Sequence, residues 1–308
     1  MDPNSAHDSA VAEVKAFQIA KCFDRNARLW GTTGARRLSE SRVMIIGLGG
    51  VGSYAAEGLA RAGVGSFSLV DFDEICITNV NRQIHAHSAT VGLSKAELMA
   101  QRIKMINPEA SITVRQAFYE DKTADEILSD KPDVILDCID NVTAKLHLLV
   151  TCILREIPVV TCLGASGKID PTRVSFAELR KTYEDPLAKM IRKTLWTKYR
   201  VNLKRVSQLI AVFSDETPIQ PDPGYKSSLC GTTCVCPNSA NQHHTCAKRN
   251  VIWGSAVFVT SVFGMIAASL TTRFLLGDMD VNLRPVLKVL PGDEPVLDPF
   301  CIDMPPRD

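Results

Sequence analysis

The chain has no surplus of charge of either sign, because 35 Lys and Arg residues stand against 34 Asp and Glu residues. The resulting net charge of +1 argues against a protein that coats nucleic acid non-specifically, so a polyanionic partner would have to meet a local basic patch. A bias toward disorder is also missing, since 45% of the 308 residues are hydrophobic. Such a chain can bury one large core or two smaller ones, as a soluble globular protein does.

A secretory signal is absent as well. The first ten residues, MDPNSAHDSA, are polar and acidic, with no basic region followed by an apolar stretch. We expect residues 1–20 to form a flexible arm outside the fold. Ten cysteines without such a signal indicate a reducing compartment, the cytoplasm, in which thiols stay free or bind metal and disulfides do not form.

One apolar stretch, 251–276, is long enough to span a bilayer. Glycine, serine and threonine residues are scattered along it, and small residues let a helix pack closely against protein neighbours. We therefore expect a buried core or subunit-interface helix here rather than a membrane anchor.

Short apolar runs alternate with helical patterns in the first half of the chain. Five runs predict buried strands: 43–46, 67–70, 112–114, 134–136 and 158–162. Strands that alternate with helices predict an α/β fold, a doubly wound and mainly parallel Rossmann-like sheet with its ligand at the carboxyl ends of the strands. After Gly164 this alternation fades, and residues 165–225 hold few convincing parallel strands. We expect an elaborated C-terminal half in the same domain.

The first predicted strand runs into GLGGVG, in which Gly47, Gly49 and Gly52 occupy the G-x-G-x-x-G positions. The first glycine permits a tight turn, the second lets a phosphate approach the backbone, and the third lets helix and strand pack closely. Asp71 follows the next strand, where a carboxylate can accept hydrogen bonds from ribose hydroxyls. Together these residues predict a nucleotide site; the alternative is a glycine turn kept for packing alone.

The charges near this turn bear on which nucleotide is bound. Helix amides can hold most of the pyrophosphate of NAD, whereas cleavage of ATP between its α and β phosphates requires cations and a metal. Arg82, Lys95 and Arg25 could supply the cations, and Asp140 the carboxylate for magnesium. Each has a simpler interpretation, as a solvated surface cation or, for Asp140, as the cap of a helix that starts near Thr143.

Long stretches of the chain resemble a known group of enzymes. RVMIIGLGGVGSYAAEGLARAGVGSFSLVDFDEICITNVNRQ, VGLSKAE and DCIDN are similar to the ATP-dependent adenylating superfamily of ubiquitin-activating enzymes and sulfur-carrier activators. This resemblance implies that Asp71 binds the ribose, that Asp140 holds magnesium, and that Arg82, Lys95, Asp140 and Arg25 are catalytic. It places Arg25 in the opposite subunit's site and so implies a homodimer. The implied ATP-binding residues are Gly47, Gly49, Gly50, Gly52, Asp71, Asp73, Asn79, Arg82, Gln83, Lys95, Asp140 and Asn141.

Within that superfamily the chain most resembles the tRNA threonylcarbamoyladenosine dehydratases, through ARLWG, NRQIHA, GASGKIDPTRV, YEDPLAKMIRKTL and GSAVFVTSVFGMIAAS. The resemblance implies that ATP adenylates the threonine carboxylate of a modified adenosine next to the anticodon, and that a tethered nitrogen then closes a ring. Because that attack is intramolecular, no protein nucleophile is required. A fungal or other eukaryotic source would add mitochondrial association to the cytoplasmic location.

The resemblance also assigns roles to the parts of the chain. It implies an ATP-binding portion at 21–164, a tRNA-binding and dimer-forming portion at 165–278 with a Cys-rich loop at 226–250, and a C-terminal extension at 279–308. Basic residues could neutralise RNA phosphates, and aromatic residues could stack on unpaired bases. The candidate tRNA-binding residues are Arg192, Lys193, Trp196, Lys198, Arg200, Lys204 and Arg205. The alternative is a solvated helix face with Trp196 in the core.

Zinc-binding C-x-x-C pairs, which sulfur-carrier activators usually have, are absent, and residues 164–229 contain no cysteine. Cys230, Cys234, Cys236 and Cys246 could form a local zinc site, but their spacing fits no common zinc motif. We expect a mobile loop with free thiols; the alternatives are a zinc site and a catalytic or redox cysteine, Cys234.

Three functions compete at this point. An ATP-dependent tRNA-modifying enzyme is favoured. An adenylating enzyme for a ubiquitin-like or sulfur-carrier protein is disfavoured by the missing C-x-x-C pairs and by the basic stretch. An NAD-dependent oxidoreductase, or a catalytically silent nucleotide-binding module, is disfavoured by Arg82, Lys95 and Asp140. A monovalent cation and a sulfur-transfer protein stay open as an additional cofactor and partner.

Overall fold

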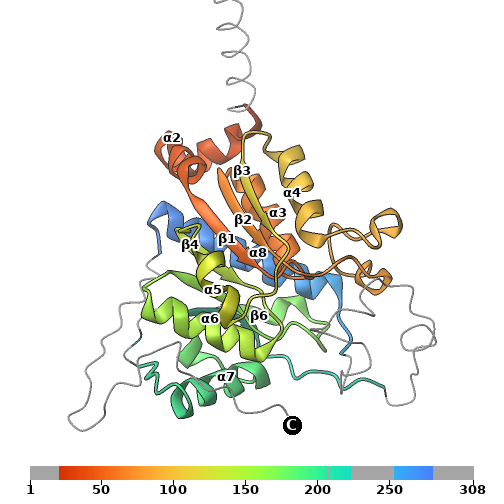
Figure 1. The fold of residues 1–308 in the computed structure, drawn as a ribbon, viewed down its shortest axis with the longest axis vertical. Coiled ribbons are helices and arrows are strands. Elements are labelled where there is room, and N and C mark those ends of the chain that lie inside the picture. Colours follow the sequence, from red (N-terminus) through yellow and green to blue (C-terminus); the bar gives the residue numbers. More distant parts are fainter. Residues whose placement is uncertain (1–20, 205, 207–208, 223–252, 280–308) are drawn as a thin grey trace, which may run out of the picture.

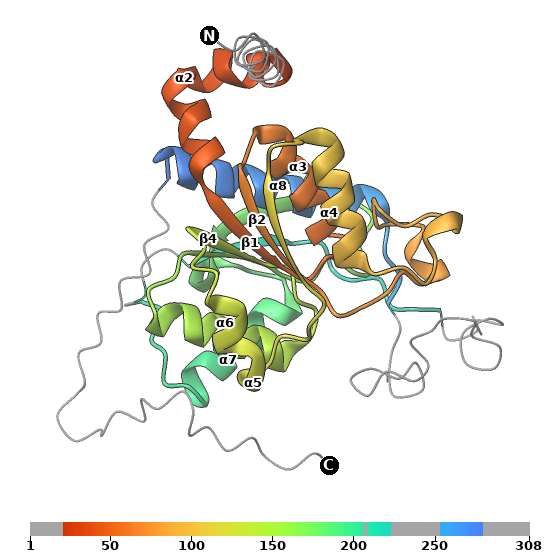
Figure 2. The same cartoon turned by 45° about the horizontal axis from the view of Figure 1, so that its top comes forward.

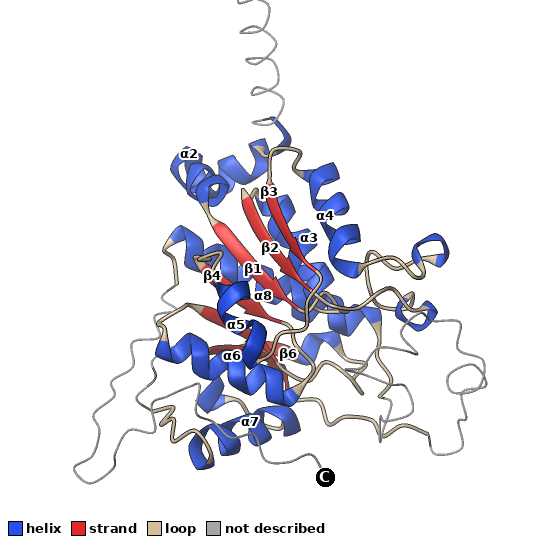
Figure 3. Ribbon diagram, viewed as in Figure 1, coloured by secondary structure: helices blue, strands red, loops and turns tan. Residues whose placement is uncertain are grey.

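A seven-stranded sheet forms the centre of the protein (Figures 1 and 3). The computed structural model describes residues 21–204, 206, 209–222 and 253–279, and in them the strand order is β3-β2-β1-β4-β5-β7-β6. Neighbouring strands pair in parallel except β6 and β7, which pair antiparallel. The strands are β1 (Arg42–Ile46), β2 (Ser66–Val70), β3 (Ser111–Arg115), β4 (Val134–Asp137), β5 (Val159–Cys162), β6 (Val174–Glu178) and β7 (Ile210–Ser214).

Helices cover both faces of this sheet (Figure 2). One face carries α2 (Asp24–Glu40), α3 (Gly52–Ala62), α4 (Lys95–Ile106) and α8 (Val257–Leu276). The other carries α5 (Asp121–Leu128), α6 (Val142–Leu154) and α7 (Pro186–Thr197). Four 3-10 turns connect these elements: η1 (Ile77–Asn79), η2 (Ser88–Thr90), η3 (Pro171–Arg173) and η4 (Leu179–Lys181). The predicted α/β fold, with a doubly wound and mainly parallel sheet, is confirmed.

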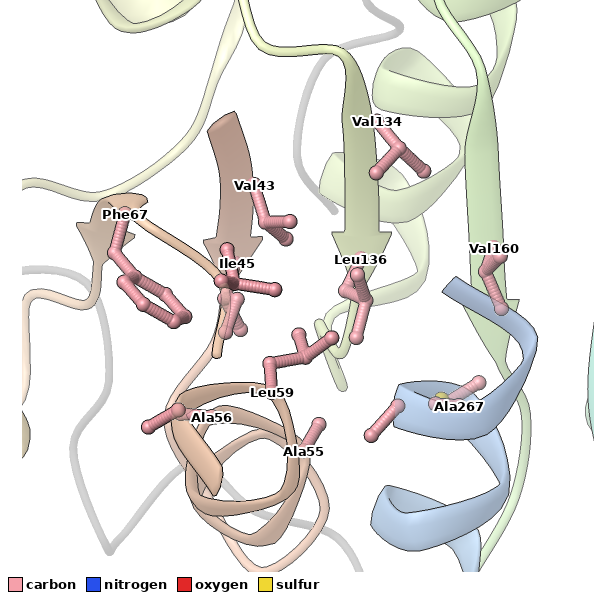
Figure 4. Close-up of a cluster of buried hydrophobic side chains, with 14 of the residues drawn as sticks. Val43, Ile45, Ala55, Ala56, Leu59, Phe67, Val134, Leu136, Val160 and Ala267 are labelled. Carbon is pink, nitrogen blue, oxygen red and sulfur yellow. The ribbon is translucent and has the colours of Figure 1, made fainter. Parts of the chain in front are cut away.

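The strand residues are apolar on both sides because both faces of the sheet are covered. In β1, Val43 and Ile45 belong to the core under α3 and α8, whereas Met44 and Ile46 belong to the core under α6. Successive side chains of a strand point to opposite faces, so a continuous apolar run is what a doubly covered strand requires. Figure 4 shows part of the first core, where side chains of α3 and of α8 meet those of the sheet.

Small residues let α8 lie directly against α3. A Cβ on Gly264 would lie 2.4 Å from the carbonyl oxygen of Val51, and a Cβ on Gly58 would lie 2.9 Å from the Cβ of Ala268. α8 is long and apolar enough to cross a membrane, yet residues such as Phe263 are buried in the protein core. The predicted buried helix is therefore confirmed, although it begins at Val257 and not at residue 251.

Two strands extend the sheet after Gly164, only one of them parallel, in agreement with the expectation of few parallel strands there. β7 is buried along its whole length and pairs in parallel with β5, and β6 then closes the edge of the sheet in the antiparallel direction. The apolar run 210–213 is as long as the run 43–46 that predicts β1, so the strand at β7 was recognisable from the sequence. Several predictions lie outside the described residues: the arm at 1–20, Arg205, the loop at 226–250 with Cys230, Cys234, Cys236 and Cys246, and the extension from residue 280 onward.

Candidate active site

The glycine turn connects the carboxyl end of β1 to α3. Gly47 has a φ of +93°, and a Cβ on it would lie 2.6 Å from the carbonyl oxygen of Cys138. A Cβ on Gly52 would lie 1.8 Å from the carbonyl oxygen of Gly47. At Gly49, in contrast, a Cβ would meet only the amide nitrogen of Gln83, at 3.9 Å. Packing therefore requires the first and third glycines, whereas the second borders open space through which a phosphate could approach.

Asp71 holds this turn from the end of β2. Its carboxylate accepts hydrogen bonds from the backbone N–H of Leu48 at 2.6 Å and of Asp73 at 2.8 Å. Burial raises the pKa of Asp71, and the nearby Lys95 ammonium opposes that rise. Each carboxylate oxygen can accept a further hydrogen bond, so a ribose hydroxyl could still donate to it. The ribose-binding role of Asp71 stays a prediction; its contact with the turn is observed.

Lys95 is the first residue of α4, next to the Ser94 cap. Its ammonium donates a hydrogen bond to the Asp73 carboxylate at 2.7 Å and makes no other with the described residues. Burial lowers the pKa of Lys95, but the charges of Asp71 and Asp73 outweigh burial and the pKa is raised. Lys95 is therefore a cation at neutral pH, and two of its three N–H bonds are available to an anion.

Arg82 lies beside the glycine turn. A Cβ on Gly50 would lie 3.3 Å from the Arg82 Cγ, which places the side chain against the turn. Its guanidinium donates to the carbonyl oxygen of Thr78 at 2.8 Å and to the Asn81 Oδ1 at 3.0 Å. These contacts orient the guanidinium, whose planar fork of N–H donors matches the geometry of phosphate oxygens.

The two amide side chains of this segment have different environments. Asn79 closes η1, because its Oδ1 accepts a hydrogen bond from the backbone N–H of Cys76 at 2.9 Å. Gln83 is buried beside Gly49, and its Oε1 has no hydrogen-bond partner among the described residues. A buried amide oxygen without a donor costs about 1–3 kcal/mol, so Gln83 is suited to receive a donor from a ligand or a water. This orphaned oxygen beside an open glycine fits a bound nucleotide.

A second lysine, Lys145 of α6, lies beneath the end of β4. It is fully buried, and its ammonium contacts the equally buried Asp137 carboxylate at 2.7 Å. It also donates to the carbonyl oxygen of Cys162 at 3.0 Å and to the Thr161 hydroxyl at 3.3 Å. Sequence reasoning missed this pair; the only signal was a lysine inside an otherwise apolar helix pattern, VTAKLHLLVTCIL.

Asp140 follows β4 at the surface. Its carboxylate is exposed and forms no hydrogen bond or ion pair with the described residues, and its charge contributes to the raised pKa of Lys95. The Asn141 side chain caps α6 by accepting a hydrogen bond from the N–H of Ala144 at 3.0 Å, so the alternative of Asp140 as the cap is wrong. One carboxylate suits Mg²⁺, which usually takes its other ligands from phosphates and water.

Arg25 is the one predicted catalytic residue that the fold keeps away from this edge. Its neighbour Asn26 donates a hydrogen bond to the carbonyl oxygen of Arg61 at 2.6 Å, and Phe23 packs against Gly63. These contacts lie at the C-terminal end of α3, whereas the glycine turn lies at its N-terminal end (Figure 1). Arg25 could reach a nucleotide only in a site on another copy of the chain.

α7 presents part of the basic stretch on its outer face. Ala188, Ile191 and Leu195 face the core, while the Trp196 side chain is 54% exposed. The alternative that buries Trp196 in the core is therefore wrong. Arg192 is half-buried and donates a hydrogen bond to the Thr182 hydroxyl. The remaining described candidates are exposed: Lys193, Lys198, Arg200 and Lys204.

These exposed residues lie away from the glycine turn. α7 begins beside Gly164, at the carboxyl end of β5, because Asp185 caps the helix there. The chain then returns to the amino-terminal edge of the sheet, where β7 starts opposite Val160 of β5.

Metal ligands other than Asp140 are scarce in the described part of the chain. It contains no group of three or more His, Cys, Asp or Glu side chains that could hold a metal ion. No disulfide joins the described cysteines, which are Cys22, Cys76, Cys138, Cys152 and Cys162.

Most of the chain is similar to proteins of known name. The ThiF family profile matches residues 23–294. The chain is 39% identical to the tRNA threonylcarbamoyladenosine dehydratase of Escherichia coli (strain K12), over 80% of this chain and 90% of that protein. It is 38% identical to the protein of the same name from Bacillus subtilis (strain 168), over 84% of this chain and 96% of that protein. The crystal structure of the E. coli enzyme in complex with ATP matches with a TM-score of 0.71 at 36% identity and covers 84% of this chain and 95% of that one.

Proposed function

Because this chain belongs to the ThiF family, we propose that it is an ATP-dependent dehydratase of tRNA. Its substrate is N6-threonylcarbamoyladenosine next to the anticodon, and its product is the cyclised form of that nucleoside. Two similar proteins bear the name of this activity, and this chain matches each of them over nearly its whole length. A crystal structure of one of them contains ATP.

The first step joins the substrate carboxylate to AMP. A carboxylate oxygen of the threonyl group attacks the α-phosphorus of ATP, the bond from that phosphorus to the bridging oxygen breaks, and pyrophosphate leaves. The ribose hydroxyls bind Asp71, and the phosphates lie over the open side of Gly49. Arg82 and Lys95 stabilise the negative charge that moves onto the departing pyrophosphate. Magnesium, held by Asp140, would add a further positive charge at the same phosphates.

The second step closes the ring. A nitrogen of the same modification attacks the activated carbonyl, the bond to the AMP oxygen breaks, and the nitrogen loses its proton. AMP leaves with one oxygen of the original carboxylate, so the nucleoside loses the elements of one water. Because the nitrogen is tethered to the carbonyl, the effective molarity is high and the chain needs no nucleophile of its own.

The observation that carries the proposal is the position of Lys95. It is a buried cation with a single hydrogen-bond partner among the described residues, near a glycine whose missing Cβ leaves room for a phosphate. An enzyme that only binds a dinucleotide has no need of such a cation, since helix amides suffice for a pyrophosphate that stays intact.

The proposal extends to assembly and to the division of the chain. Residues 21–164 bind ATP, and residues 165–278 bind tRNA and form a homodimer in which each copy supplies Arg25 to the other copy's site. The distance of Arg25 from its own glycine turn supports this arrangement. We also propose a cytoplasmic location, as for a protein whose cysteines work in a reducing compartment.

The proposal is tested by incubating the protein with ATP, Mg²⁺ and tRNA that carries the threonylcarbamoyl modification. We expect stoichiometric AMP, pyrophosphate and a nucleoside that is lighter by one water. The same tRNA without the modification is the matched control and should release no AMP. AMP that forms only after a small carrier protein is added would overturn the proposal in favour of a carrier-protein activator.

A further inference from the structure

Three distant segments of the chain meet just beyond the glycine turn. The Asn81 amide donates a hydrogen bond to the carbonyl oxygen of Ser255 at 2.9 Å, and the hydroxyls of Ser255 and Ser166 are 3.1 Å apart. These partners are 174 and 89 residues apart in sequence, so only the fold brings them together. We call Asn81, Ser166, Ser255 and Trp253 the serine rim.

The serine rim adjoins the residues proposed to contact the phosphates of ATP. Asn81 accepts a hydrogen bond from Arg82 at 3.0 Å. Thr260, which lies one turn into the helix that follows Ser255, would be 3.2 Å from a Cβ on Gly50. The rim therefore contacts Arg82 directly through Asn81, and the first turn of α8 connects it to the glycine turn.

Sheet order indicates which side of the nucleotide the rim occupies. Along the carboxyl edge the strands follow in the order β2, β1, β4 and β5. They present Asp71, the glycine turn, Asp140 and then the loop that carries Ser166. The ribose, the phosphates and magnesium account for the first three positions. The fourth position carries no residue that is assigned to ATP, so it is the part of this edge that is left for a second ligand beside the nucleotide.

Buried charges hold the loop of Ser166 in place. Lys168 is 2% exposed, donates a hydrogen bond to the carbonyl oxygen of Ser214 at 2.9 Å, and lies 3.5 Å from an Asp185 carboxylate oxygen. The Glu216 carboxylate accepts a hydrogen bond from the backbone N–H of Ile169 at 2.9 Å. Burying these ions is unfavourable unless they are paired, and the pairing fixes a loop on which the Ser166 side chain is exposed.

An aromatic side chain borders the same loop. Gly167 has a φ of +74°, and a Cβ on it would lie 3.0 Å from the Trp253 Cε3, so the indole packs on the loop backbone. The Gly167 N–H donates to the carbonyl oxygen of Gly254 at 2.8 Å, which fastens the two segments together. Trp253 is nevertheless 38% exposed, so part of its ring is free to contact a ligand.

We propose that the serine rim is the subsite that receives the modified nucleoside itself, an inference that rests on the proposed function. The hydroxyls of Ser166 and Ser255 bind the threonyl-carbamoyl group, since a hydroxyl can donate to a carboxylate oxygen and accept from a carbamoyl N–H. Trp253 stacks on the adenine, as aromatic side chains do with unpaired RNA bases. Asn81 is a positioning residue, because its amide is already engaged by Ser255 and Arg82.

The test compares binding of two tRNAs that differ only in the threonylcarbamoyl group. The wild-type protein should bind the modified tRNA more tightly. The preference is the ratio of the affinities for modified and unmodified tRNA. In the double variant Ser166→Ala with Ser255→Ala it should fall about tenfold or more, because two hydrogen bonds to the threonylcarbamoyl group are lost. The affinities for unmodified tRNA and for ATP should stay unchanged. Ser175→Ala, at an exposed serine of β6, is the matched control and should keep the full preference.

Trp253 is tested in the same assay and by steady-state AMP release. Trp253→Ala should raise the KM for modified tRNA by about fivefold to a hundredfold, and Trp253→Phe should restore most of the loss because a ring is retained. Equal preference and equal KM in the wild type and in all of these variants would overturn the subsite. A wild-type protein that releases no AMP with modified tRNA would instead overturn the proposed function, so the two failures are distinguishable.

Discussion

Two lysines at the carboxyl edge of the sheet form ion pairs of the same length and have different surroundings. Both Lys95–Asp73 and Lys145–Asp137 have an N–O distance of 2.7 Å. Neither side chain of the Lys145 pair is exposed, whereas the Asp73 side chain is 29% exposed. The Lys145 ammonium donates to three residues, and the Lys95 ammonium donates to one.

The difference shows that hydrogen-bond saturation, not ion-pair distance, separates a structural lysine from one that is available to a ligand. Lys145 has no N–H bond left over, so its charge serves to hold α6 against β4 and β5. Lys95 has two left over, beside the Asp73 carboxylate at the same edge of the sheet. We therefore assign Lys145 to the fold and propose that Lys95 contacts the phosphates of ATP.

The largest effect is expected at Lys145. Lys145→Met should lower the free energy of unfolding by about 3–5 kcal/mol, because it leaves the Asp137 carboxylate buried without its counter-ion. Chemical denaturation without nucleotide measures this loss. Replacing both partners, with Lys145→Met and Asp137→Leu, should recover part of the stability, since no lone buried charge remains. A loss below about 1 kcal/mol for the single variant would place the pair among ordinary surface ion pairs.

The corresponding change at Lys95 should affect chemistry instead. Lys95→Met should lower the rate of AMP formation about 10²–10³-fold, the usual effect of removing one preorganised donor to developing charge, and it should leave a cooperative unfolding transition. Lys104→Met is the matched control, because Lys104 is an exposed lysine of the same helix. Turnover at the wild-type rate in Lys95→Met would show that Lys95 does not take part in the reaction and that its role, like that of Lys145, is structural.

His85 offers a test through pH. Burial, with the charges of Lys95 and Arg102, lowers the pKa of His85 to about 3. Unfolded histidine titrates near pH ~6.5, so below that pH the unfolded chain binds a proton that the folded chain does not, and stability falls as the pH falls. Between about pH 6.5 and pH 5 the loss should reach about 2 kcal/mol. His85→Gln should flatten this dependence, and His87→Gln, at an exposed position, should not.

The smallest effect is expected at the exposed lysines of the basic stretch, Lys193 and Lys198. Their side chains are not buried, and their N–H donors are not all used in hydrogen bonds within the protein. Lys193→Glu with Lys198→Glu should weaken tRNA binding and reduce the slope of log affinity against log salt by about one for each phosphate that is no longer bound. Lys122→Glu, at an exposed position of α5 on the same face of the sheet, controls for a general effect of charge, with half the change in net charge. An unchanged slope would show that Lys193 and Lys198 are solvated surface residues that do not bind tRNA phosphates.

The sequence predicted the glycine turn and its surroundings well because local rules govern them. Gly47 and Gly52 are required by turn geometry, and a strand that ends before Asp71 must bring it to the same edge of a parallel sheet. The position of Trp196 on the outer face of α7 was left open, although the spacing of Ala188, Ile191 and Leu195 could have settled it.

Other features depend on contacts that no local pattern encodes. The approach of Ser166 to Ser255 joins residues that are 89 positions apart in sequence, and it depends on how α8 packs against the sheet. Lys145 was missed because helical periodicity places it in the core, where a lysine requires an acid from another element. Arg25 lies near the C-terminal end of α3, far from the glycine turn, so the role that we propose for it depends on a second copy of the chain, which no local pattern describes.

The central claim is that the enzyme activates the substrate carboxylate by joining it to AMP from ATP at the carboxyl edge of the sheet. Transfer of an oxygen isotope tests this claim directly. The modified tRNA is prepared with heavy oxygen in both positions of the threonine carboxylate and incubated with the protein, ATP and Mg²⁺, and the released AMP is analysed by mass spectrometry. The account predicts one heavy oxygen in each AMP, because the first step joins a carboxylate oxygen to the α-phosphorus. Unlabelled AMP, or label found in inorganic phosphate with ADP as the product, would contradict it.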